Sequence, residues 1–574
     1  MLIRTLNKDL RAAAETLNYP VEKINVTYSD RPDLCQFQCN AAFALAKELH
    51  CPPIKIAEAL ANRFNETYPY AKAEAVAPGF LNFSVSDAAF SALLDELLTD
   101  PNCGVEKTDH PRKIVIDYGG PNIAKPLHVG HLRSAVIGEC LKRLARFLGN
   151  DVTGDVHLGD WGTQMGLVIA GLEERYDMSC YFGAKTPKPH FTLEDLNEIY
   201  PLASARSKTD EPFRQKAQEI TFRLQKHEEG YYKLWQDICA ISVADIKKDY
   251  AALNVEFDLW NGESTCDAYV NPMIDGFVQQ NLAYESYGAL VMDVAEETDE
   301  KPMPPIILRK SNGAQLYAST DLATICERME TLNPDEIWYV VDARQGLHFE
   351  QVFRCARKTG LVSPETKLIH IPFGTVNGKD GKPFKTREGG TMKLKDLIAM
   401  ISEAAEKLLS PGALQLDPDA PRKVGCAALK YGDLVCNRTK NYIFDIDKFV
   451  QFDGKTGSYL LYTLVRIRSL LAKAGQPSPD AGIEISLPEE RDVLMKMQLL
   501  SSAYRQAYNE KLPSFLCEAS YDLANAFNVF YGNHKIMGEP DPIRRNTWIA
   551  LSAAVGKLLE QTLNILGMET VPAM

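Results

Sequence analysis

The sequence predicts a multidomain α/β protein, in which a Rossmann-like parallel-sheet domain lies between an N-terminal α+β domain and a C-terminal all-α helical bundle. Three observations support this fold class. A β-loop-α pattern begins at residue 113, and strand-like runs return at 306–308, 336–341 and 367–373 with helical segments between them. The N-terminal residues mix helical periodicity with a turn that leads into a strand. From about residue 400, apolar residues recur at helical spacing.

The patterns divide the chain into six regions. These are an α+β domain at 1–110, two halves of the Rossmann-like domain at 111–174 and 301–400 around a charged, helix-rich insertion at 175–300, a helical connector at 401–458, and the bundle at 459–574. In the first region we expect helices at 41–47 and 54–64 and a strand at 80–83. In the bundle we expect helices at 459–473, 491–508 and 548–566.

Composition narrows the class of protein. A chain of 574 residues, 45% hydrophobic and 24% charged, is globular and too long for one core. No apolar run approaches the roughly 18 residues of a membrane span, so we expect a soluble, cytoplasmic protein that does not contact membranes. Thirteen cysteines without a CxxC pair favour reduced thiols and no structural zinc. The net charge of −13 argues against indiscriminate nucleic-acid binding, but residues 401–574 hold 19 Lys and Arg against 20 Asp and Glu, which leaves room for a basic face there.

Two imidazoles, His128 and His131, flank Gly130 where the first helix of the Rossmann-like domain should begin. Unpaired N–H groups and the helix dipole favour a bound phosphate at such a position. Asn122 and Lys125 add donors just upstream.

Two other interpretations of the histidine pair stay open on the residues alone. The histidines can be structural, or they can ligate a metal together with His157 and Asp160. A second motif favours phosphate, because the segment 377–390 joins glycines to cations that include Lys382 and Lys385. A glycine-flanked cationic loop can close over a polyphosphate, although a solvated charged turn has the same composition.

Several motifs resemble those of a known family. The run from His128 to His131 matches the HIGH signature of class I aminoacyl-tRNA synthetases, and residues 382–386 resemble their KMSKS loop, with departures at Pro383, Phe384 and Thr386. Residues 121–126, 159–164 and 317–321 are similar to arginyl-tRNA synthetases in particular. The resemblance spans nearly the whole chain.

The resemblance implies an enzyme that activates L-arginine with ATP, releases pyrophosphate, and transfers arginine to the 3′-terminal ribose of its tRNA. His128, His131 and Lys385 are then the expected catalytic residues, as donors to the triphosphate and to the departing pyrophosphate. Mg²⁺ is expected to be carried on the phosphates. The expected ATP-binding residues are His128, Gly130, His131, Lys382, Lys385, His370, Phe373, Gly374 and Val376.

The substrate guanidinium is a planar fork of donors that carboxylates bind best. Asp117 ends the first strand of the domain, and Tyr317 and Asp321 lie one helical turn apart; on the residues alone either aspartate can also be a helix cap or a surface charge. The resemblance implies that Asp117, Tyr317 and Asp321 read the guanidinium. A lysine substrate can use similar acids, but its point charge needs no flat clamp. Together with Lys125, the residues expected to hold the other end of the substrate are Asn122 and Gln345.

For tRNA, the resemblance implies that the N-terminal domain contacts the outer corner and the helical domain binds the anticodon. Aromatic and cationic residues that can stack bases and hold phosphates occur together at Tyr459, Tyr462, Arg466 and Arg468, although bundle packing can also explain them. The resemblance also implies a monomer that needs bound tRNA before it activates arginine.

Three alternatives compete with the ligase. A different nucleotidyltransferase of the same superfamily has its own histidine loop but needs no large helical domain at the C-terminus. An RNA-binding or regulatory protein that lost catalysis should lack catalytic groups, whereas both histidines and Lys385 are present. A metal-dependent hydrolase requires stoichiometric zinc.

Overall fold

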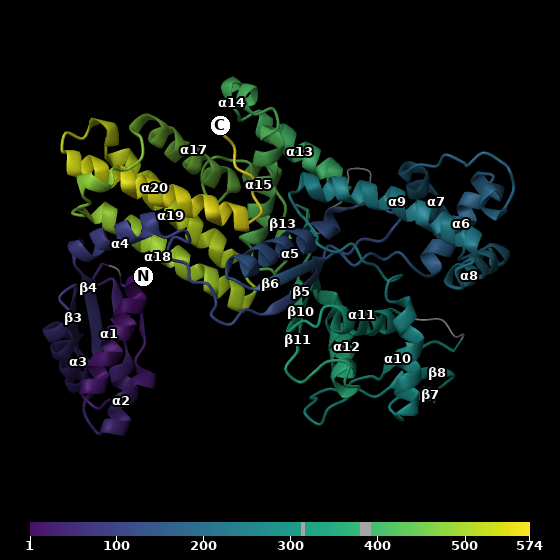
Figure 1. Cartoon of the computed structure of the whole chain (residues 1–574), viewed down its shortest axis with the longest axis horizontal. Coiled ribbons are helices and arrows are strands. Elements are labelled where there is room, and N and C mark those ends of the chain that lie inside the picture. Colours follow the sequence, from purple (N-terminus) through teal and green to yellow (C-terminus); the bar gives the residue numbers. More distant parts are fainter. Residues whose placement is uncertain (32, 312–315, 379–380, 382–391) are drawn as a thin grey trace. The chain divides into compact units, whose positions relative to one another are not determined.

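The computed structural model describes residues 1–31, 33–311, 316–378, 381 and 392–574, which form two compact units (Figure 1). The first, here called the sheet unit, consists of Lys107–Ser458, Glu510–Ser514 and Asn564–Met574. The second, here called the helical unit, consists of Met1–Glu106, Tyr459–Asn509 and Phe515–Leu563.

The sheet unit is built on four parallel strands in the spatial order β11-β10-β5-β6. Their bounds are Lys113–Tyr118 for β5, Asp151–Asp155 for β6, Glu336–Asp342 for β10 and Lys367–Phe373 for β11. Helix α5, Val129–Phe147, connects β5 to β6, and α12, Gly346–Lys358, connects β10 to β11. The two connections run toward opposite edges of the sheet, so the order of strands reverses between β5 and β10. At such a switch point the carboxyl ends of the strands open a crevice for a ligand, and the predicted Rossmann-like fold is confirmed.

The two central strands form because their residues are apolar and buried on both faces, as in Ile114 to Ile116 of β5. One face of the sheet packs Val115, Ile337, Tyr339 and Leu368 into a core with residues of the covering helices. On the other face Gly138 lets α5 approach β5 closely, since a Cβ there would lie 2.3 Å from the Tyr118 ring.

The strand expected at residues 306–308 exists, but its expected place in the parallel sheet is wrong. It is β9, Ile306–Arg309, and it pairs antiparallel with β8, Ala289–Met292, in a separate sheet completed by β7, Tyr284–Ser286. Alternate residues of β9 are buried and partly or fully exposed, which suits a sheet with one face in solvent rather than the doubly covered parallel sheet.

The other elements of the sheet unit fall into two groups along the chain. The helices between β6 and β10 are α6 Thr163–Arg175, α7 Leu193–Arg206, α8 Glu211–Gln225, α9 Glu229–Ala252, α10 Asp267–Gln279 and α11 Tyr317–Thr331. The elements after the sheet are β12 Val376–Asn377, α13 Leu394–Glu406, α14 Pro411–Leu416, α15 Ala420–Leu434, β13 Tyr442–Ile443 and α16 Ile446–Phe449.

The helical unit joins an antiparallel sheet, ordered β1-β2-β4-β3, to a set of long helices. Its first part comprises α1 Leu2–Thr16, β1 Val26–Tyr28, β2 Phe37–Cys39, α2 Ala41–Leu49, α3 Pro53–Thr67, β3 Ala71–Val76, β4 Phe80–Val85 and α4 Asp87–Thr99. The long helices are α17 Gly457–Ala474, α18 Pro488–Glu510, α19 Ser514–Asn533 and α20 Pro542–Ile565. The Tyr28 hydroxyl donates to the Gln498 carbonyl at 3.1 Å, which links the two parts.

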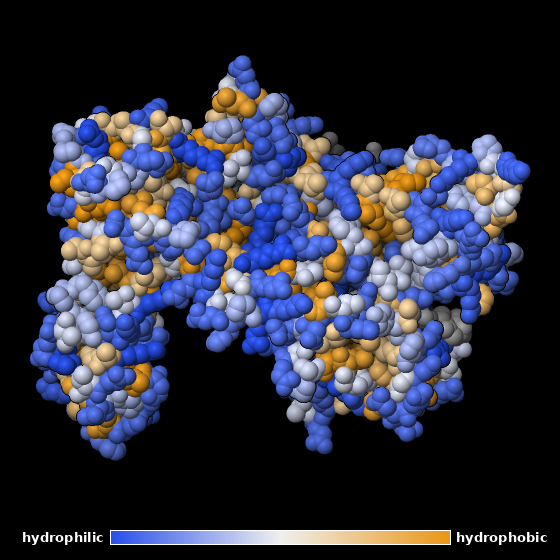
Figure 2. Space-filling model, in the orientation of Figure 1, coloured by the Kyte–Doolittle hydropathy of each residue, from blue (hydrophilic) through white to orange (hydrophobic). Residues whose placement is uncertain are grey.

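No helix formed by the described residues is long and apolar enough to cross a bilayer. On the face drawn in Figure 2, hydrophobic residues appear in scattered groups among hydrophilic ones.

Candidate active site

A cavity of about 480 Å³ opens where β5, β10 and β11 end, at the switch point of the sheet. A cavity of this size and position suits a nucleotide or another small polar ligand. Its described lining includes Asp117, Gly119, Gly120, His128, Gly130, His131, Arg133, Asp342, Gln345, Phe373, Gly374 and Val376.

His128 and His131 form a capping box at the start of α5. The backbone N–H of Gly130 donates to His128 Nδ1 at 3.0 Å, and the backbone N–H of His128 donates to His131 Nδ1 at 3.1 Å. Because both Nδ1 atoms accept, each neutral ring carries its proton on Nε2. Gly130 is required, since a Cβ there would lie 2.7 Å from His128 Cε1.

The imidazole pair is neutral rather than cationic at pH 7. Burial, followed by the neighbouring Lys125 cation, lowers the pKa of His128. Burial, followed by the adjacent His128, lowers the pKa of His131 to about 3. The pair can therefore donate two Nε2–H groups to a phosphate without carrying charge of its own.

The segment 159–164 supports the loop that leads to these histidines. Gly159 pairs with the loop through its backbone, because its N–H donates to the Pro121 carbonyl at 3.0 Å and its carbonyl accepts from Ile123 N–H at 3.0 Å. A Cβ on Gly159 would lie 2.2 Å from Asn122 Oδ1. Gln164 Nε2 also donates to the Ile123 carbonyl at 2.7 Å, so the second motif fixes the first.

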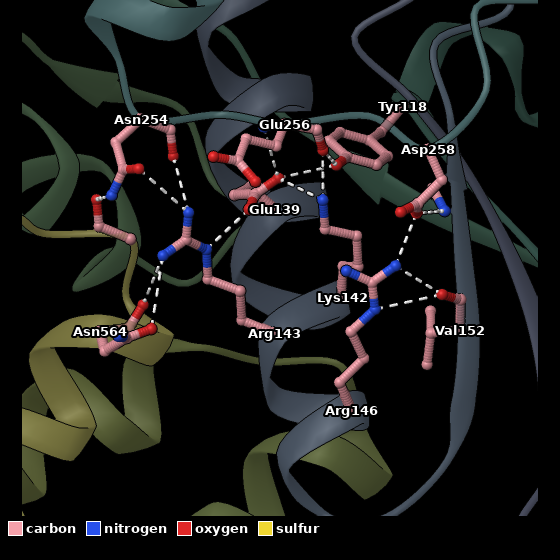
Figure 3. Close-up of polar contacts among 12 residues, drawn as sticks. Tyr118, Glu139, Lys142, Arg143, Arg146, Val152, Asn254, Glu256, Asp258 and Asn564 are labelled. Carbon is pink, nitrogen blue, oxygen red and sulfur yellow. Dashed lines mark hydrogen bonds and ion pairs between the residues drawn. The ribbon is translucent and has the colours of Figure 1, made fainter.

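A buried polar network fixes the far end of α5 (Figure 3). Glu139 accepts from the Tyr118 hydroxyl at 2.7 Å and pairs with Lys142 and Arg143 at 3.0 and 2.6 Å. Arg143 also donates to the carbonyl of Asn564 at 3.1 Å. Helix α5 is thereby tied to β5 and to the last turn of α20.

Arg143 reaches a further carbonyl, that of Asn254, at 3.1 Å, while Arg146 pairs with Asp258 at 2.6 Å (Figure 3). Burial alone would raise the pKa of Glu139, but Lys142 and Arg143 outweigh burial and the pKa is lowered. The carboxylate is therefore charged at neutral pH.

Asp117 lines the cavity, but its carboxylate is already engaged. Arg328 of α11 donates from Nη2 to Asp117 Oδ2 and to Asp155 Oδ2, each at 2.7 Å. Burial raises the pKa of Asp117, although Arg328 opposes this shift. The strand ends of β5 and β6 thus hold an arginine of the chain itself.

Tyr317 and Asp321 lie in the first turns of α11, as their spacing predicted. The structure brings Asp321 against His348 of α12, with Oδ2 and Nε2 2.5 Å apart, while Tyr317 is exposed. Neither residue lines the 480 Å³ cavity. Gln345 does line it, and Asn122 is exposed nearby in the loop that Gly159 supports. Lys125 lies over the Tyr200 ring at 4.3 Å.

Glu263 is a candidate residue that the sequence patterns did not single out. Burial, followed by the Asp160 and Asp321 carboxylates, raises its pKa to about 8. Burial raises the pKa of Tyr317, and Glu263 and Asp321 raise it as well. Glu263 lies in a polar turn of the insertion without periodicity, so only the folded structure brings it to α11.

Phe373, Gly374 and Val376 line the opposite side of the cavity, at the end of β11. Gly374 is required there because a Cβ would lie 2.7 Å from the Lys440 backbone. Its carbonyl accepts from Arg133 Nη1 at 2.8 Å. His370 lies within β11, stacked on Phe349 with ring centres 5.3 Å apart, and does not line the cavity.

The two lysines expected to complete the site, Lys382 and Lys385, lie outside the described residues. Among the residues that the structure does describe, no three His, Cys, Asp or Glu side chains are placed to hold a metal ion. His157 lies 3.4 Å from Thr324 Oγ1 through Nε2, and Asp160 accepts from Ser264 at 2.6 Å.

The residues expected to contact tRNA lie on α17 of the helical unit. Arg466 lies between two tyrosine rings, 4.7 Å from the centre of Tyr462 and 5.2 Å from that of Tyr531. Its Nη1 donates to Asn528 at 2.6 Å. The same Asn528 donates to the Tyr459 hydroxyl at 3.0 Å, whereas Arg468 pairs with Glu560 of α20 at 2.7 Å. Tyr459, Tyr462 and Arg466 therefore form one cluster, and Arg468 points to another helix.

Three family models match the chain. Residues 93–446 match "tRNA synthetases class I (R), catalytic domain", residues 460–574 match "DALR anticodon binding domain", and residues 2–85 match "Arginyl tRNA synthetase N terminal domain". The chain is similar to the arginine–tRNA ligase of Alkaliphilus oremlandii, at 46% identity over the whole of both chains, and to that of Agathobacter rectalis, at 44% over the whole of both.

Solved structures agree with these matches. The arginyl-tRNA synthetase of Plasmodium falciparum superposes with a TM-score of 0.82 at 25% identity, covering 100% of this chain and 99% of that one. The arginyl-tRNA synthetase of Thermus thermophilus shares the fold, with a TM-score of 0.80 at 22% identity over 100% of both chains. The chain therefore belongs to the class I arginyl-tRNA synthetase family, whose members are arginine–tRNA ligases.

Proposed function

We propose that ATP binds in the cavity at the switch point, with its triphosphate at the start of α5 and its adenine toward the end of β11. The main support is the histidine pair, because both Nδ1 atoms are occupied by backbone N–H groups and both Nε2–H donors remain for phosphate oxygens. Phe373, Gly374 and Val376 would contact the adenine side. His370 acts through the packing of Phe349, since it does not line the cavity.

Arginine would bind beside the triphosphate, with its guanidinium at the first turns of α11. Tyr317, Asp321 and Glu263 supply an aromatic face and two carboxylates for a planar cation. Asn122 and Gln345 would hold the α-amino and carboxyl end, next to the cavity. Lys125, above the Tyr200 ring, contributes positive charge near both substrates. Asp117 supports this site while paired with Arg328.

In the first step an oxygen of the arginine carboxylate forms a bond to the α-phosphorus of ATP, and the bond to the bridging oxygen of the β-phosphate breaks. Pyrophosphate leaves with the electron pair. The Nε2–H groups of His128 and His131 stabilise the charge that develops on the phosphate oxygens. Lys385, with Lys382 in support, would neutralise the departing pyrophosphate. A ribose hydroxyl of tRNA then attacks the activated carbonyl and releases AMP.

Mg²⁺ would arrive bound to the triphosphate and neutralise part of its charge. The donor set fits this arrangement, because the two carboxylates that line the described part of the cavity are both paired with arginines. Asp117 is held by Arg328 and Asp342 by Arg344, at 2.7 and 2.8 Å. The protein thus offers hydrogen-bond donors rather than metal ligands.

The tRNA would be held by residues 1–110 and by the helices of 459–574. The cluster of Tyr459, Tyr462 and Arg466 combines aromatic faces with a cation, as single-stranded RNA binding requires. Arg468 would act through Glu560 in keeping the helices together. We also propose a monomeric, cytoplasmic enzyme. All thirteen cysteines are free, which fits a reducing compartment.

Charging of total tRNA with each amino acid tests the proposal. Arginine alone should be attached, and His131→Ala should reduce the rate by about 10²–10³-fold through loss of a transition-state donor. Attachment of another amino acid would contradict the assigned specificity. Pyrophosphate exchange with arginine and ATP should be almost absent until tRNA is added, and light scattering should give the mass of one chain.

A further inference from the structure

Arg328 is a buried cation directly behind the proposed arginine site. It is 3% exposed and lies on α11, the helix that begins with Tyr317 and Asp321. Its Nη2 atom donates to Asp117 at the end of β5 and to Asp155, the last residue of β6, each at 2.7 Å. Its guanidinium also lies over the Tyr339 ring of β10, 5.6 Å from the centre. One side chain therefore joins α11 to three neighbouring strands.

The position of Arg328 on α11 relates it to the proposed guanidinium readers. Asp321 and Arg328 are seven residues apart, which is about two helical turns, so they share one face of the helix with Thr324. Thr324 lies 3.4 Å from His157, which follows β6. That face of α11 is the one turned toward the carboxyl ends of the strands.

Two of the three guanidinium nitrogens of Arg328 make no hydrogen bond to the described residues. Nη2 makes two hydrogen bonds, but Nε and Nη1 have no partner within hydrogen-bond distance among the described residues. One guanidinium thus bridges the carboxyl groups at the ends of two neighbouring strands, and breaking such a buried pair leaves a buried charge without compensation.

We propose that Arg328 is a positioning residue for arginine recognition, which holds α11 against the ends of β5 and β6 and so sets where Tyr317 and Asp321 meet the substrate guanidinium. This inference rests on the proposed arginine site. Loss of Arg328 should therefore impair arginine binding far more than ATP binding, which depends on the start of α5.

The test is kinetic and uses the whole enzyme with tRNA. Arg328→Ala should raise the KM for arginine by about 30-fold or more while the KM for ATP changes by less than about threefold, since a displacement of about 1 Å at a site can cost about 10²-fold. Guanidinium ion at about 10 mM can refill the cavity between the two carboxylates, but it also competes with the guanidinium group of the substrate. Its effect is therefore measured as the ratio of the arginine KM of Arg328→Ala to that of the unaltered enzyme, and this ratio should fall by at least about fivefold. Sodium chloride at the same concentration should have no such effect.

Arg354→Ala is the matched control, because Arg354 is an ion-paired arginine of α12 bound to Asp299 and Glu350 outside the site. The ratio of its arginine KM to that of the unaltered enzyme should not change with guanidinium. Equal increases in both KM values for Arg328→Ala, without rescue, would show that the residue serves stability alone. If Arg328→Ala does not fold, Arg328→Lys provides the test. This variant should raise the arginine KM by about tenfold, because an ammonium group cannot bridge both carboxylates as the planar guanidinium does. An unchanged KM would overturn the inference.

Asp321→Asn separates this inference from the site on which it rests. If Asp321→Asn leaves the arginine KM unchanged, the proposed arginine site is wrong. If it raises the KM while the Arg328 variants do not, the site stands and the positioning role is wrong.

Discussion

At the scale of single residues, chemistry depends on groups whose charge is set by their surroundings. His131 is neutral because it is buried next to another imidazole, and Glu263 tends toward protonation because it is partly buried and is influenced by the Asp160 and Asp321 carboxylates. A bound cationic substrate changes the ionisation of Glu263 but not that of His131. Arginine and ATP should therefore differ in the way their binding depends on pH.

Arginine binding should release a proton from Glu263. The pKa of this carboxyl is about 8 without substrate, and pairing with a guanidinium stabilises the ionised form and lowers it. Affinity for arginine should therefore rise with pH between 6 and 8, by at most about tenfold for each pH unit. Titration calorimetry in buffers of different ionisation enthalpy measures the proton directly.

The matched variant is Glu263→Gln, which keeps the size of the side chain and removes its charge. Its arginine affinity should be lower at pH 8 and independent of pH between 6 and 8. A pH dependence that persists in this variant would assign the proton to another group.

Gly130→Ala should damage catalysis without unfolding the protein. The added Cβ would lie 2.7 Å from His128 Cε1 and would displace the ring from its backbone partner. The charging rate should fall by about 10–10²-fold, while the melting temperature stays within about 2 °C because alanine suits a helix. The control is Gly276→Ala in α10, where no atom lies within 4 Å of the new Cβ. Normal charging by Gly130→Ala would mean that the His128 ring position is unimportant.

At the scale of elements, α5 carries the histidines at one end and a buried ionic network at the other. Glu139 and Lys142 are each 2% exposed, and Glu139 meets two cations and a hydroxyl. Because the carboxylate is surrounded by donors, its neutralisation leaves buried positive charge without compensation. The network therefore determines how firmly α5 is held.

Glu139→Gln should lower the free energy of unfolding by about 3 kcal/mol at neutral pH, through loss of one partner of a buried pair. Urea unfolding measures this value. In contrast, Glu198→Gln removes a surface partner of Arg175 and should cost less than about 1 kcal/mol. If both variants lower the free energy of unfolding by the same amount, water reaches the network.

Much of this fold was predictable from the sequence, because its elements carry local signals. The buried runs of β5, β10 and β11 and the histidine pair at a helix start are such signals. The sheet to which β9 belongs was not predictable, since short apolar runs do not specify their partners. Nor was the ionisation of the histidines, which depends on burial. Glu263 and Arg328 act through neighbours distant in sequence, and such pairings exist only in the fold.

At the scale of the whole molecule, the sheet unit is discontinuous along the chain. Residues Asn564–Met574 begin at the end of the last long helix, α20, yet they belong to the sheet unit. Lys430, which is 1% exposed, donates from Nζ to the Gly567 carbonyl at 2.6 Å, and Arg422 pairs with Glu569 at 2.7 Å. The tail therefore supplies partners to two cations of α15, the buried Lys430 and the partly exposed Arg422.

Deletion of residues 567–574 should destabilise the sheet unit. Burial lowers the pKa of Lys430 to about 8, and loss of the Gly567 carbonyl removes a partner of this ammonium. The melting temperature should fall by about 5 °C or more, and charging should fall with it. Lys430→Met in the shortened chain should recover part of the stability by removing the buried charge. Shortened protein that melts normally would show that the tail is dispensable.

The discontinuity also has a consequence for synthesis on the ribosome. Most of the sheet unit, Lys107–Ser458, emerges well before Asn564–Met574, and the long helices are made in between. The partners that Arg143 and Lys430 find at Asn564 and Gly567 are thus absent while the rest of the unit collapses. Helix α5 cannot reach its final anchorage until the tail has been translated. The nascent enzyme is consequently assembled in two stages, and the second of these completes the support of the histidine pair.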